Sequence, residues 1–342
     1  MTRSRDTADT QDNLGGAVAP FVAGKNGVIN GGFDIWQRGT SVTLNTTNYL
    51  ADRWVGYNAA GASTATRQAT NDTTNLPSIQ YCMRIQRTAG NASTNSINTA
   101  QSFESVNSIQ YAGKTVTLSF YARAGANYSG ASNALQVYLA TGTGTDQSAI
   151  SGFTNNIYVI NTPATLTTTW QRFTYTAAVA SNRTQVAPYF VHVPVGTAGA
   201  ADYFEITGVQ LELGSVATPF ARAGGSIGGE LALCQRYYYL VSCQAGNPLA
   251  GIGYAQSTQV FDSQLNQPVS MRTVPSSIDY SGVRVFSTAS GNVSGGTVTL
   301  FGSNLNASYI RYTHGSIVFL QDQPGKMQAN VNGAYIGLSA EL

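Results

Sequence analysis

Apolar and polar residues alternate with a period of two along much of the chain, which is typical of β-strands with one buried face. In residues 116–122, for example, the even positions are apolar and the odd positions carry Thr, Ser and Tyr. The clearest strands are predicted at 80–87, 115–122, 135–140, 157–160, 170–176, 186–195 and 202–213. Their number and their Gly, Asn, Ser and Thr turns predict a β-sandwich whose strands have one core face and one face in water.

A second β region follows a glycine-rich joint. Four glycines fall within residues 222–229, and the helix formers in 230–237 predict a turn or two of helix. Further on, 267–275 is bounded by prolines, which predicts an edge strand, and 333–342 is expected to be a closing strand. We therefore expect an all-β chain with two β-sandwich domains in tandem. Their predicted bounds are 28–222 and 253–342, with the joint and short helix over 223–252.

Residues 1–27 show no period of either kind and hold several early charges. Such a segment is either a leader without fixed structure or an extended arm that orders when it docks on a partner. We expect a docking arm. Its candidate contact residues are Arg3, Arg5, Asp6 and Asp9.

Charged residues make up only 10% of the 342 residues, against about 25% in an ordinary soluble domain, and there are 36 glycines. A surface kept wet by hydroxyls and amides is typical of extracellular β proteins and not of a helical cytosolic enzyme. The net charge of +2 comes without any stripe of Lys or Arg, so no nucleic-acid partner is expected. No apolar stretch approaches the length of a membrane span, and the amino end lacks the apolar core of a signal peptide.

The cysteines and histidines predict neither a disulfide framework nor a metal site. Cys82, Cys234 and Cys243 are too few and too unevenly spaced for such a framework, and we expect buried free thiols. Neither His192 nor His314 lies near a cysteine, so zinc is not expected, and no cofactor is predicted.

The sequence predicts no enzyme. His192 alternates with valines, as a strand histidine does, and His314 is expected in a turn. There is no nucleophile elbow before a helix and no phosphate-binding loop with Lys. Glycoside hydrolysis needs two carboxyls held a few ångströms apart, and the spacing singles out no pair. The available carboxylates are Asp34, Asp52, Glu104, Asp202, Glu205 and Glu212.

Several motifs resemble bacteriophage virion proteins of the tail-fibre and head-fibre kind. They are the leader TRSRDTAD, the segment GVQLELGSVATPF at 208–220, CQRYY at 234–238 and the terminal SAEL. Residues 28–222 also resemble jelly-roll carbohydrate-binding modules, which open with Asn-Gly-Gly-Phe, here 30–33, and close with Val-x-Leu-Glu, here 209–212. The resemblance implies a homotrimer, located in the virion and assembled in the host cytoplasm.

The same resemblance implies a structural calcium near the two ends of the jelly roll. Asp34 stands where such modules place an acidic ligand, but Thr207 and Gly208 replace the expected aspartates. A hard cation needs several oxygen ligands. Asp34 is thus a candidate calcium ligand that lacks its usual partners, and no metal is predicted.

Tyrosine predominates among the aromatic residues, with 19 Tyr against 13 Phe and 3 Trp. A tyrosine stacks on the C–H face of a sugar while its hydroxyl hydrogen-bonds, so tyrosines on polar strand faces are candidate glycan contacts. Tyr121 and Tyr138 have that parity, next to Arg123 and Gln136. If the two strands are neighbours, one exposed face carries all four; scattered surface tyrosines or subunit contacts are the alternatives. The tryptophans expected in the core are Trp36, Trp54 and Trp170.

These observations predict a non-enzymatic virion structural protein, a tail fibre held by its arm. Its partners would be other tail or capsid proteins and a host surface polysaccharide or lipopolysaccharide. One alternative is a head fibre or capsid decoration protein, because both kinds use an arm with β modules. A secreted carbohydrate-binding module and a hydrolytic fibre are further alternatives.

Overall fold

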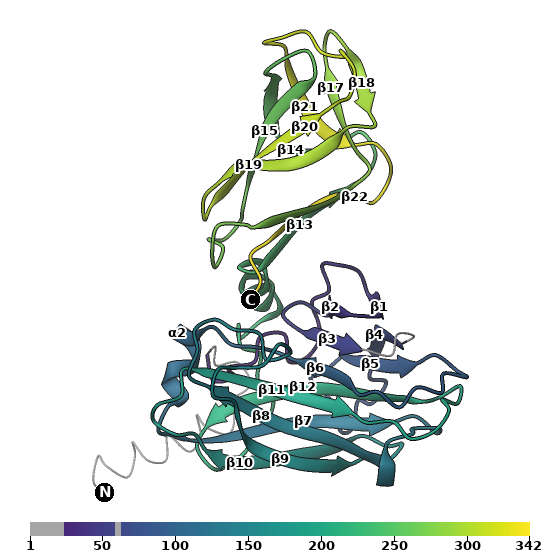
Figure 1. Cartoon of the computed structure of the whole chain (residues 1–342), viewed down its shortest axis with the longest axis vertical. Helices are drawn as coiled ribbons and strands as arrows, with labels where there is room; N and C mark the ends of the chain where they lie inside the picture. The colour runs from purple at the N-terminus through teal and green to yellow at the C-terminus, as the bar shows by residue number, and fades with distance from the viewer. Residues whose placement is uncertain (1–23, 59–62) are drawn as a thin grey trace, which may run out of the picture. The chain divides into compact units, whose positions relative to one another are not determined.

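The computed structural model describes residues 24–58 and 63–342, and the chain is all-β (Figure 1). It divides into two compact units, with the boundary after Leu231. We call the described residues up to Leu231, together with Leu342, the N-module, and Ala232–Glu341 the C-module. The predicted docking residues Arg3, Arg5, Asp6 and Asp9 lie outside the described residues.

The N-module is a jelly-roll β-sandwich of two six-stranded antiparallel sheets (Figure 1). Sheet A contains, in spatial order, β1 (Ser41–Leu44), β4 (Ser63–Ala69), β5 (Tyr81–Arg87), β12 (Tyr203–Leu213), β7 (Thr115–Ala124) and β10 (Gln171–Ala178). Sheet B contains β2 (Thr47–Tyr49), β3 (Val55–Asn58), β6 (Ile97–Ala100), β11 (Gln185–His192), β8 (Ala134–Gly142) and β9 (Ile157–Thr165). The short helices are α2 (Ser105–Ser108), η2 (Ile109–Tyr111) and η3 (Ala131–Asn133). All seven strands predicted in this region are confirmed.

Apolar side chains from the two sheets meet in one core. The ring of Phe120 from sheet A meets that of Phe190 from sheet B edge to face, 4.9 Å between centroids. Trp54 is fully buried beside Phe33, at 5.0 Å. A buried phenylalanine of this kind contributes about 3–5 kcal/mol relative to alanine. Trp36 is also buried in this core, so its prediction, like that for Trp54, is confirmed.

The outer face of sheet A differs from its prediction. Polar side chains of β7 and β12 were expected in water, but on β12 they are at most 3% exposed: Glu205, Thr207, Gln210 and Glu212. A small apolar cluster packs on this face and includes Ile79, Phe220 and the third tryptophan, Trp170. The segments around Ile79 and Phe220 cover the outer face of the sheet. The alternation of apolar and polar residues within a strand cannot reveal that another segment covers its polar face.

A β-bulge at Gly208 changes the alternation within β12. The pairing register with β7 shifts between Thr207 and Gln210, and Gly208 has a φ of +57°. Before the bulge the even-numbered Ile206 faces the core, and after it the odd-numbered Val209 does. Glycine suits the bulge because other residues adopt a positive φ at a cost.

The C-module is a second sandwich, made of a three-stranded and a seven-stranded antiparallel sheet. Sheet C contains β13 (Tyr238–Cys243), β22 (Ala334–Ser339) and β16 (Ser277–Ser281). Sheet D contains β18 (Gly291–Ser294), β17 (Val283–Ser287), β21 (Pro324–Ala329), β14 (Pro248–Ala255), β15 (Val260–Asn266), β20 (Ala307–Thr313) and β19 (Thr297–Ser303). The predicted closing strand is confirmed as β22.

Two sequence expectations around the C-module need correction. Residues 267–275 form no strand, because their backbone bonds elsewhere: Met271 N–H, for example, donates to the carbonyl of Leu305 at 2.8 Å. The joint is also shorter than 223–252. The predicted helix is α3 (Ile227–Gln235), and β13 follows at once to pair with β22.

The N-module likewise extends beyond its expected start at residue 28. Asn26 is buried, and its side-chain amide donates to the carbonyls of Val209 and Ala221, at 3.0 Å each. Residues 24–27 of the predicted arm therefore belong to the sandwich.

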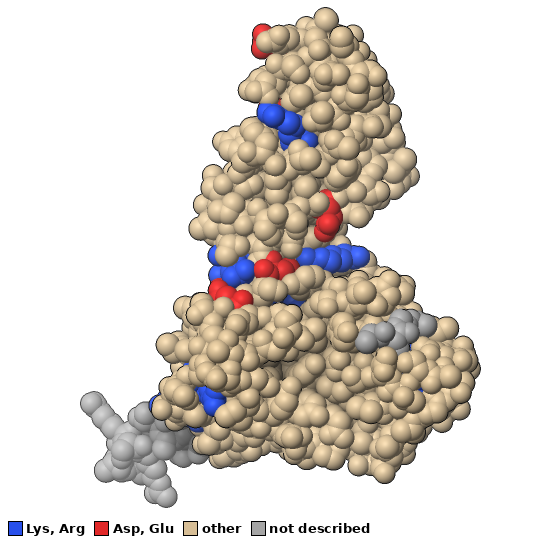
Figure 2. Space-filling view, in the orientation of Figure 1, with Lys and Arg blue, Asp and Glu red and all other residues tan. Residues whose placement is uncertain are grey.

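Charged side chains are sparse on the surface that Figure 2 shows, as the composition indicates. Among the described residues, no helix has both the length and the apolar character needed to cross a bilayer.

Candidate functional site

The four predicted glycan contacts divide between the two sheets. Tyr121 and Arg123 lie on β7 in sheet A, whereas Gln136 and Tyr138 lie on β8 in sheet B. All four alternate with core residues, so each pair points away from the core on its own side of the sandwich. The hypothesis of one shared face is wrong, because the connection between β7 and β8 carries the chain from one sheet to the other.

The pair on sheet A is occupied by contacts within the protein. Tyr121 packs against the apolar cluster of the outer face, and the guanidinium of Arg172 lies 5.7 Å from its ring centroid. The Arg123 guanidinium lies 4.8 Å from the Trp170 ring and donates a short hydrogen bond to Glu205, at 2.5 Å. These side chains therefore stabilise the sheet and its cover.

Glu205 is the centre of a buried charge cluster on sheet A. Its side chain is fully buried, and it pairs with Arg123 on one side and with Arg84, at 2.6 Å, on the other. The Arg84 guanidinium also stacks 3.9 Å from the centroid of Tyr203. The two flanking cations compensate the desolvation of this carboxylate, which gives it a structural role.

The pair on sheet B lies within a group of tyrosines. The ring centroid of Tyr138 is 4.5 Å from that of Tyr158 on β9 and 6.0 Å from that of Tyr189 on β11. Strand pairing places Tyr138 directly between Tyr189 and Asn161, on the same outer face as Gln136. We call these five residues, Gln136, Tyr138, Tyr158, Asn161 and Tyr189, the tyrosine face.

The polar groups of the tyrosine face are free to bind. Neither the three hydroxyls nor the Gln136 amide forms a hydrogen bond with any other residue that the structure describes. Tyr158 is 41% exposed, and Tyr138 and Tyr189 are half-buried. Burial raises the pKa of Tyr189 to about 12 and also raises that of Tyr138, so both hydroxyls remain protonated donors at neutral pH. The face thus offers aromatic rings beside hydroxyl and amide groups.

Sequence reasoning missed Tyr158 and Tyr189, although both lie in strands that it predicted. Strand order decides which side chains meet on a face, and alternation within one strand carries no information about its neighbours. The sequence offered one sign of this group, which is that three of the predicted strands each contain a tyrosine.

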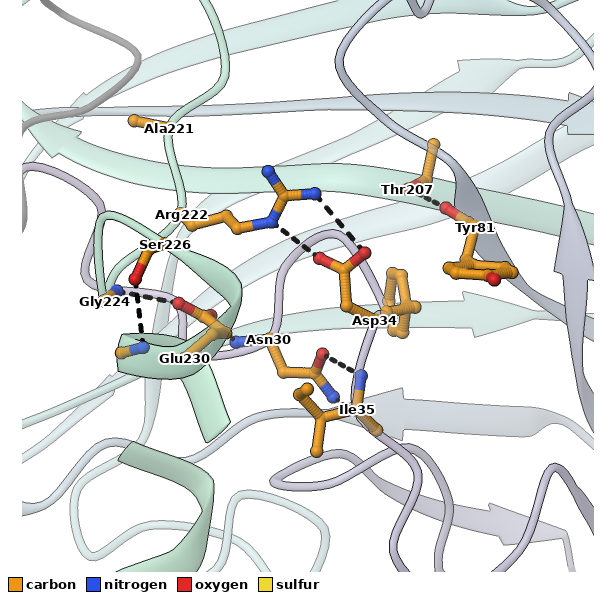
Figure 3. A network of polar contacts seen from close by, with 12 residues as sticks. Asn30, Asp34, Ile35, Tyr81, Thr207, Ala221, Arg222, Gly224, Ser226 and Glu230 are labelled. Atoms are coloured by element: carbon orange, nitrogen blue, oxygen red, sulfur yellow. Dashed lines mark hydrogen bonds and ion pairs between the residues drawn. The ribbon is translucent and has the colours of Figure 1, made fainter. Parts of the chain in front are cut away.

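Asp34, the candidate calcium ligand, is engaged by an arginine (Figure 3). Arg222 Nε donates to Asp34 Oδ2 at 2.8 Å and Arg222 Nη2 donates to Oδ1 at 3.3 Å. Thr207, at one position of the expected aspartates, donates its hydroxyl to the Tyr81 carbonyl. A guanidinium on both carboxylate oxygens repels a cation, so these residues do not fit calcium. Within the described residues, no group of three or more His, Cys, Asp and Glu could hold a metal ion.

Glu230 joins the start of α3 to the opening Asn-Gly-Gly-Phe segment (Figure 3). Its carboxylate accepts hydrogen bonds from the backbone N–H groups of Asn30 and Gly224, the latter at 2.7 Å. The Asn30 side chain in turn accepts from Ile35 N–H at 3.0 Å. The start of α3 and the opening segment of the jelly roll therefore hold each other in place.

Ser129, His192 and Asp202 lie together in the N-module, but not as a catalytic triad. Asp202 Oδ2 accepts from Ser129 Oγ at 2.8 Å and pairs with Arg87 Nη1 at 2.7 Å. His192 Nε2 lies 3.5 Å from Ser129 Oγ, and Nδ1 has no partner among the described residues. In a triad the carboxylate orients the histidine, and here it holds the serine.

His192 is also too deeply buried for a base that meets substrate. It is 1% exposed and stacks on Tyr128 at 4.5 Å. Burial lowers its pKa to about 4; Asp202 opposes the shift and Arg87 adds to it. His192 lies on β11, as its alternation with valines predicted. None of the three cysteines forms a disulfide among the described residues; Cys82 and Cys234 are buried and Cys243 is half-buried.

No protein-family model matches the chain, and no curated protein matches it in sequence. Among solved structures it is similar to the enzymatically active domain of tailspike protein 4 from bacteriophage CBA120, with 14% identity, a TM-score of 0.34 and coverage of 55% of this chain and 21% of that one. The chain thus spans about a fifth of that structure's length.

Two further similar structures are described as carbohydrate-binding modules. One is titled "CBM4 structure and function", with 19% identity, a TM-score of 0.31 and coverage of 55% of this chain and 100% of that one. The other is TmCBM61 in complex with beta-1,4-galactotriose, with 13% identity, a TM-score of 0.33 and coverage of 55% and 99%. At these identities the similarity concerns the fold alone.

Proposed function

We propose that the N-module binds a saccharide on the tyrosine face, as part of a non-enzymatic bacteriophage virion protein that contacts the host surface. The observation that carries the proposal is the group of three tyrosine rings with unpartnered hydroxyls, whose centroids lie 4.5–6.5 Å apart on one outer face of the sandwich.

The chemistry of the tyrosine face suits an uncharged sugar. Aromatic rings pack against the C–H face of a sugar ring, while hydroxyl and amide groups bond its hydroxyls. Gln136 and Asn161 supply an acceptor and donors beside the rings. Because none of its five residues is charged, the face favours neutral hexoses over acidic ones.

The absence of turnover is part of the proposal. The arrangement of Ser129, His192 and Asp202 supports it, because the carboxylate bonds the serine and the cluster is buried. Incubating the protein with a polysaccharide that it binds should therefore release no new reducing ends. New reducing ends that disappear when one carboxylate is neutralised would instead identify a hydrolytic fibre.

The proposed virion role is a tail fibre whose arm, residues 1–23 of the chain, docks on other tail or capsid proteins. Its receptor would be host polysaccharide or lipopolysaccharide.

The low ionic content and the edges of the sandwich support an assembled protein: β9 and β10 each pair with a single neighbour among the described strands. Open edges are normally covered, which favours a homotrimer. Light scattering of the purified protein should therefore give the mass of three chains. The mass of a single chain at micromolar protein concentration would contradict the trimer.

The glycan-binding proposal is tested with a pair of tyrosine variants. An array of bacterial surface polysaccharides first identifies a saccharide that the full chain binds, and isothermal titration then measures its Kd. Tyr138→Ala should weaken binding by about tenfold, because one stacking partner is lost. Tyr121→Ala, on the covered outer face of sheet A, is the matched control and should leave the Kd unchanged. Equal Kd values for wild type and Tyr138→Ala, or no binding on the array, would overturn the proposal.

A further inference from the structure

A groove in the C-module lies on one face of sheet D. It has a volume of about 350 Å³ and is lined by side chains from four adjacent strands, β14, β15, β20 and β19. The lining side chains that concern us are Ile252, Tyr254, Asp262, Gln264, Phe301 and Tyr309. We call this the sheet D groove.

Large apolar side chains in the sheet D groove are unusually exposed. Ile252 is 86% exposed, Tyr254 51%, Phe301 48% and Tyr309 43%. The rings of Phe301 and Tyr309 lie 6.0 Å apart. Exposed aromatic side chains that converge on one concave site, rather than scattering singly, mark a binding surface.

Strand register explains why these side chains converge. Tyr254 pairs with Asp262 and Asp262 pairs with Arg311, so the three form a row across β14, β15 and β20. Gln264 pairs with Tyr309 in the next row. Each row therefore joins an aromatic side chain to a polar one.

A fixed ion pair lies within the first row. Arg311 Nε donates to Asp262 Oδ1 and Arg311 Nη2 donates to Oδ2, both at 2.8 Å. The Asp262 side chain is 7% exposed, that of Arg311 29%, and the guanidinium lies 4.4 Å from the centroid of the Phe301 ring. A bidentate pair stacked on a ring holds its donors and acceptors in a fixed geometry.

We infer that the sheet D groove is a second saccharide-binding site, independent of the tyrosine face and specific for an uncharged sugar. Sugar hydroxyls both donate and accept, which matches Gln264, the Asp262 carboxylate and the Arg311 guanidinium. The ring of Tyr309 or Phe301 covers the apolar face of the sugar. An acidic sugar gains little, because Asp262 already compensates the charge of Arg311.

An apolar peptide or a second copy of the chain fits the groove less well than a sugar does. Either occupant would take the Asp262–Arg311 pair and the Gln264 amide out of water, and desolvating charged and polar groups is costly even when they are paired with each other. The aromatic rings alone would suit an apolar partner. The ion pair beside them distinguishes the two kinds of ligand.

The experiment uses the full chain with Tyr138→Ala, in which binding at the tyrosine face is weakened by about tenfold. The probe is an array of neutral hexose, N-acetylhexosamine and deoxyhexose oligosaccharides. This variant should retain binding to part of the array. Adding Tyr309→Ala should reduce that binding by about tenfold, whereas Tyr309→Phe, which keeps the ring, should preserve most of it.

The matched control is Phe286→Ala, on β17 of the same sheet, where the ring is 37% exposed but outside the groove. It should leave binding unchanged. Loss of all binding in Tyr138→Ala alone would overturn the second site while upholding the first. Equal effects of Tyr309→Ala and Phe286→Ala would overturn it too, as would a change of oligomeric state in Tyr309→Ala with saccharide binding intact. Binding that survives Tyr138→Ala in full and is lost with Tyr309→Ala would uphold the groove and contradict the tyrosine face.

Discussion

At the scale of single residues, the few charges of the N-module are used inside it. Arg87 pairs with Asp202, Arg222 with Asp34, and Glu205 with two arginines. The acidic partners are at most 6% exposed in their side chains. These pairs join segments more than 80 residues apart in the chain. A low charge content therefore does not mean that the charges are dispensable.

Glu205 provides a direct test of this role. Glu205→Gln leaves Arg84 and Arg123 facing a neutral amide at a fully buried position, and breaking a buried pair costs about 3–5 kcal/mol. Urea unfolding of the N-module should show this loss. The control is Asp72→Asn, in an exposed turn, and it should have a much smaller effect. Similar unfolding curves for both variants would contradict the structural role of Glu205.

His192 predicts how the stability of the N-module depends on pH. Burial lowers the pKa of its imidazole from 6.5 to about 4, so the unfolded state binds the proton more readily. The contribution of His192 is therefore fully present above pH 6.5 and is lost as the pH falls toward 4, by up to about 3 kcal/mol.

His192→Phe should remove this dependence while keeping a ring against Tyr128. The difference between the stability–pH curves of wild type and His192→Phe gives the contribution of His192 alone. Other titrating groups, among them Glu230, whose pKa is raised by burial, contribute equally to both curves. Thermal unfolding from pH 7 to pH 4 makes the measurement, with His314→Phe in the C-module as the control. Parallel curves for wild type and His192→Phe would show that the imidazole is not held neutral.

At the scale of elements, the bulge in β12 is the feature that decides which side chains face the core. Gly208 allows it, because its φ is +57°. A Cβ at this position would lie 2.8 Å from Ile79 Cδ1 and 2.9 Å from Tyr121 Cδ2. An alanine there would meet both backbone strain and the cover of sheet A.

Gly208→Ala should destabilise the N-module by more than the roughly 1 kcal/mol that a positive φ costs a side chain. Gly196→Ala is a matched control, because Gly196 has a φ of +74° and a Cβ there would have no described atom within 4 Å. Differential scanning calorimetry of the two variants separates the cost of backbone strain from the cost of the contacts with Ile79 and Tyr121. A loss of stability in Gly196→Ala as large as that in Gly208→Ala would contradict the packing of the cover.

Alternation predicted the elements well and their surroundings poorly. Seven strands of the N-module, α3 and β22 were predicted because each is set by local pattern. The cover over Glu205 and Gln210 was missed, since alternation within β12 carries no information about the segments around Ile79 and Phe220 that supply it. The failure at 267–275 has the same origin, because the backbone of Met271 bonds to Leu305 and not to a neighbouring strand.

The tyrosine face was predicted only in part, because alternation within a strand does not show which strands are neighbours. Gln136 and Tyr138 were identified by parity alone, and both lie on the tyrosine face. Tyr121 and Arg123 have the same parity but are covered. Which sheet each strand joins is a property of the whole fold, and the sequence of a single strand does not contain it.

At the scale of the whole molecule, we propose an arm that docks on the virion and two modules that each carry an aromatic binding surface. The structure refines where the arm ends. Asn26 bonds to the carbonyls of Val209 and Ala221, so residue 26 belongs to the N-module, and the proposed arm is limited to residues 1–23, which lie outside the described residues.

Deleting residues 1–23 should abolish incorporation into phage particles while both modules keep their unfolding temperatures. Extending the deletion through residue 27 removes Asn26 and should lower the unfolding temperature of the N-module. Particle incorporation is measured by immunoblot of purified virions, and unfolding by calorimetry. Normal incorporation of the shorter deletion would contradict a docking arm.

We propose above all that the N-module binds sugar on the tyrosine face. NMR tests this in a titration of the full chain, with ¹³C-labelled tyrosine rings, against an oligosaccharide that it binds. We expect the ring signals of Tyr138, Tyr158 and Tyr189 to shift together with one Kd, while those of Tyr121 and Tyr203 stay in place. Shifts confined to Tyr121 and Tyr203, or saturating binding that leaves Tyr138, Tyr158 and Tyr189 unmoved, would contradict it.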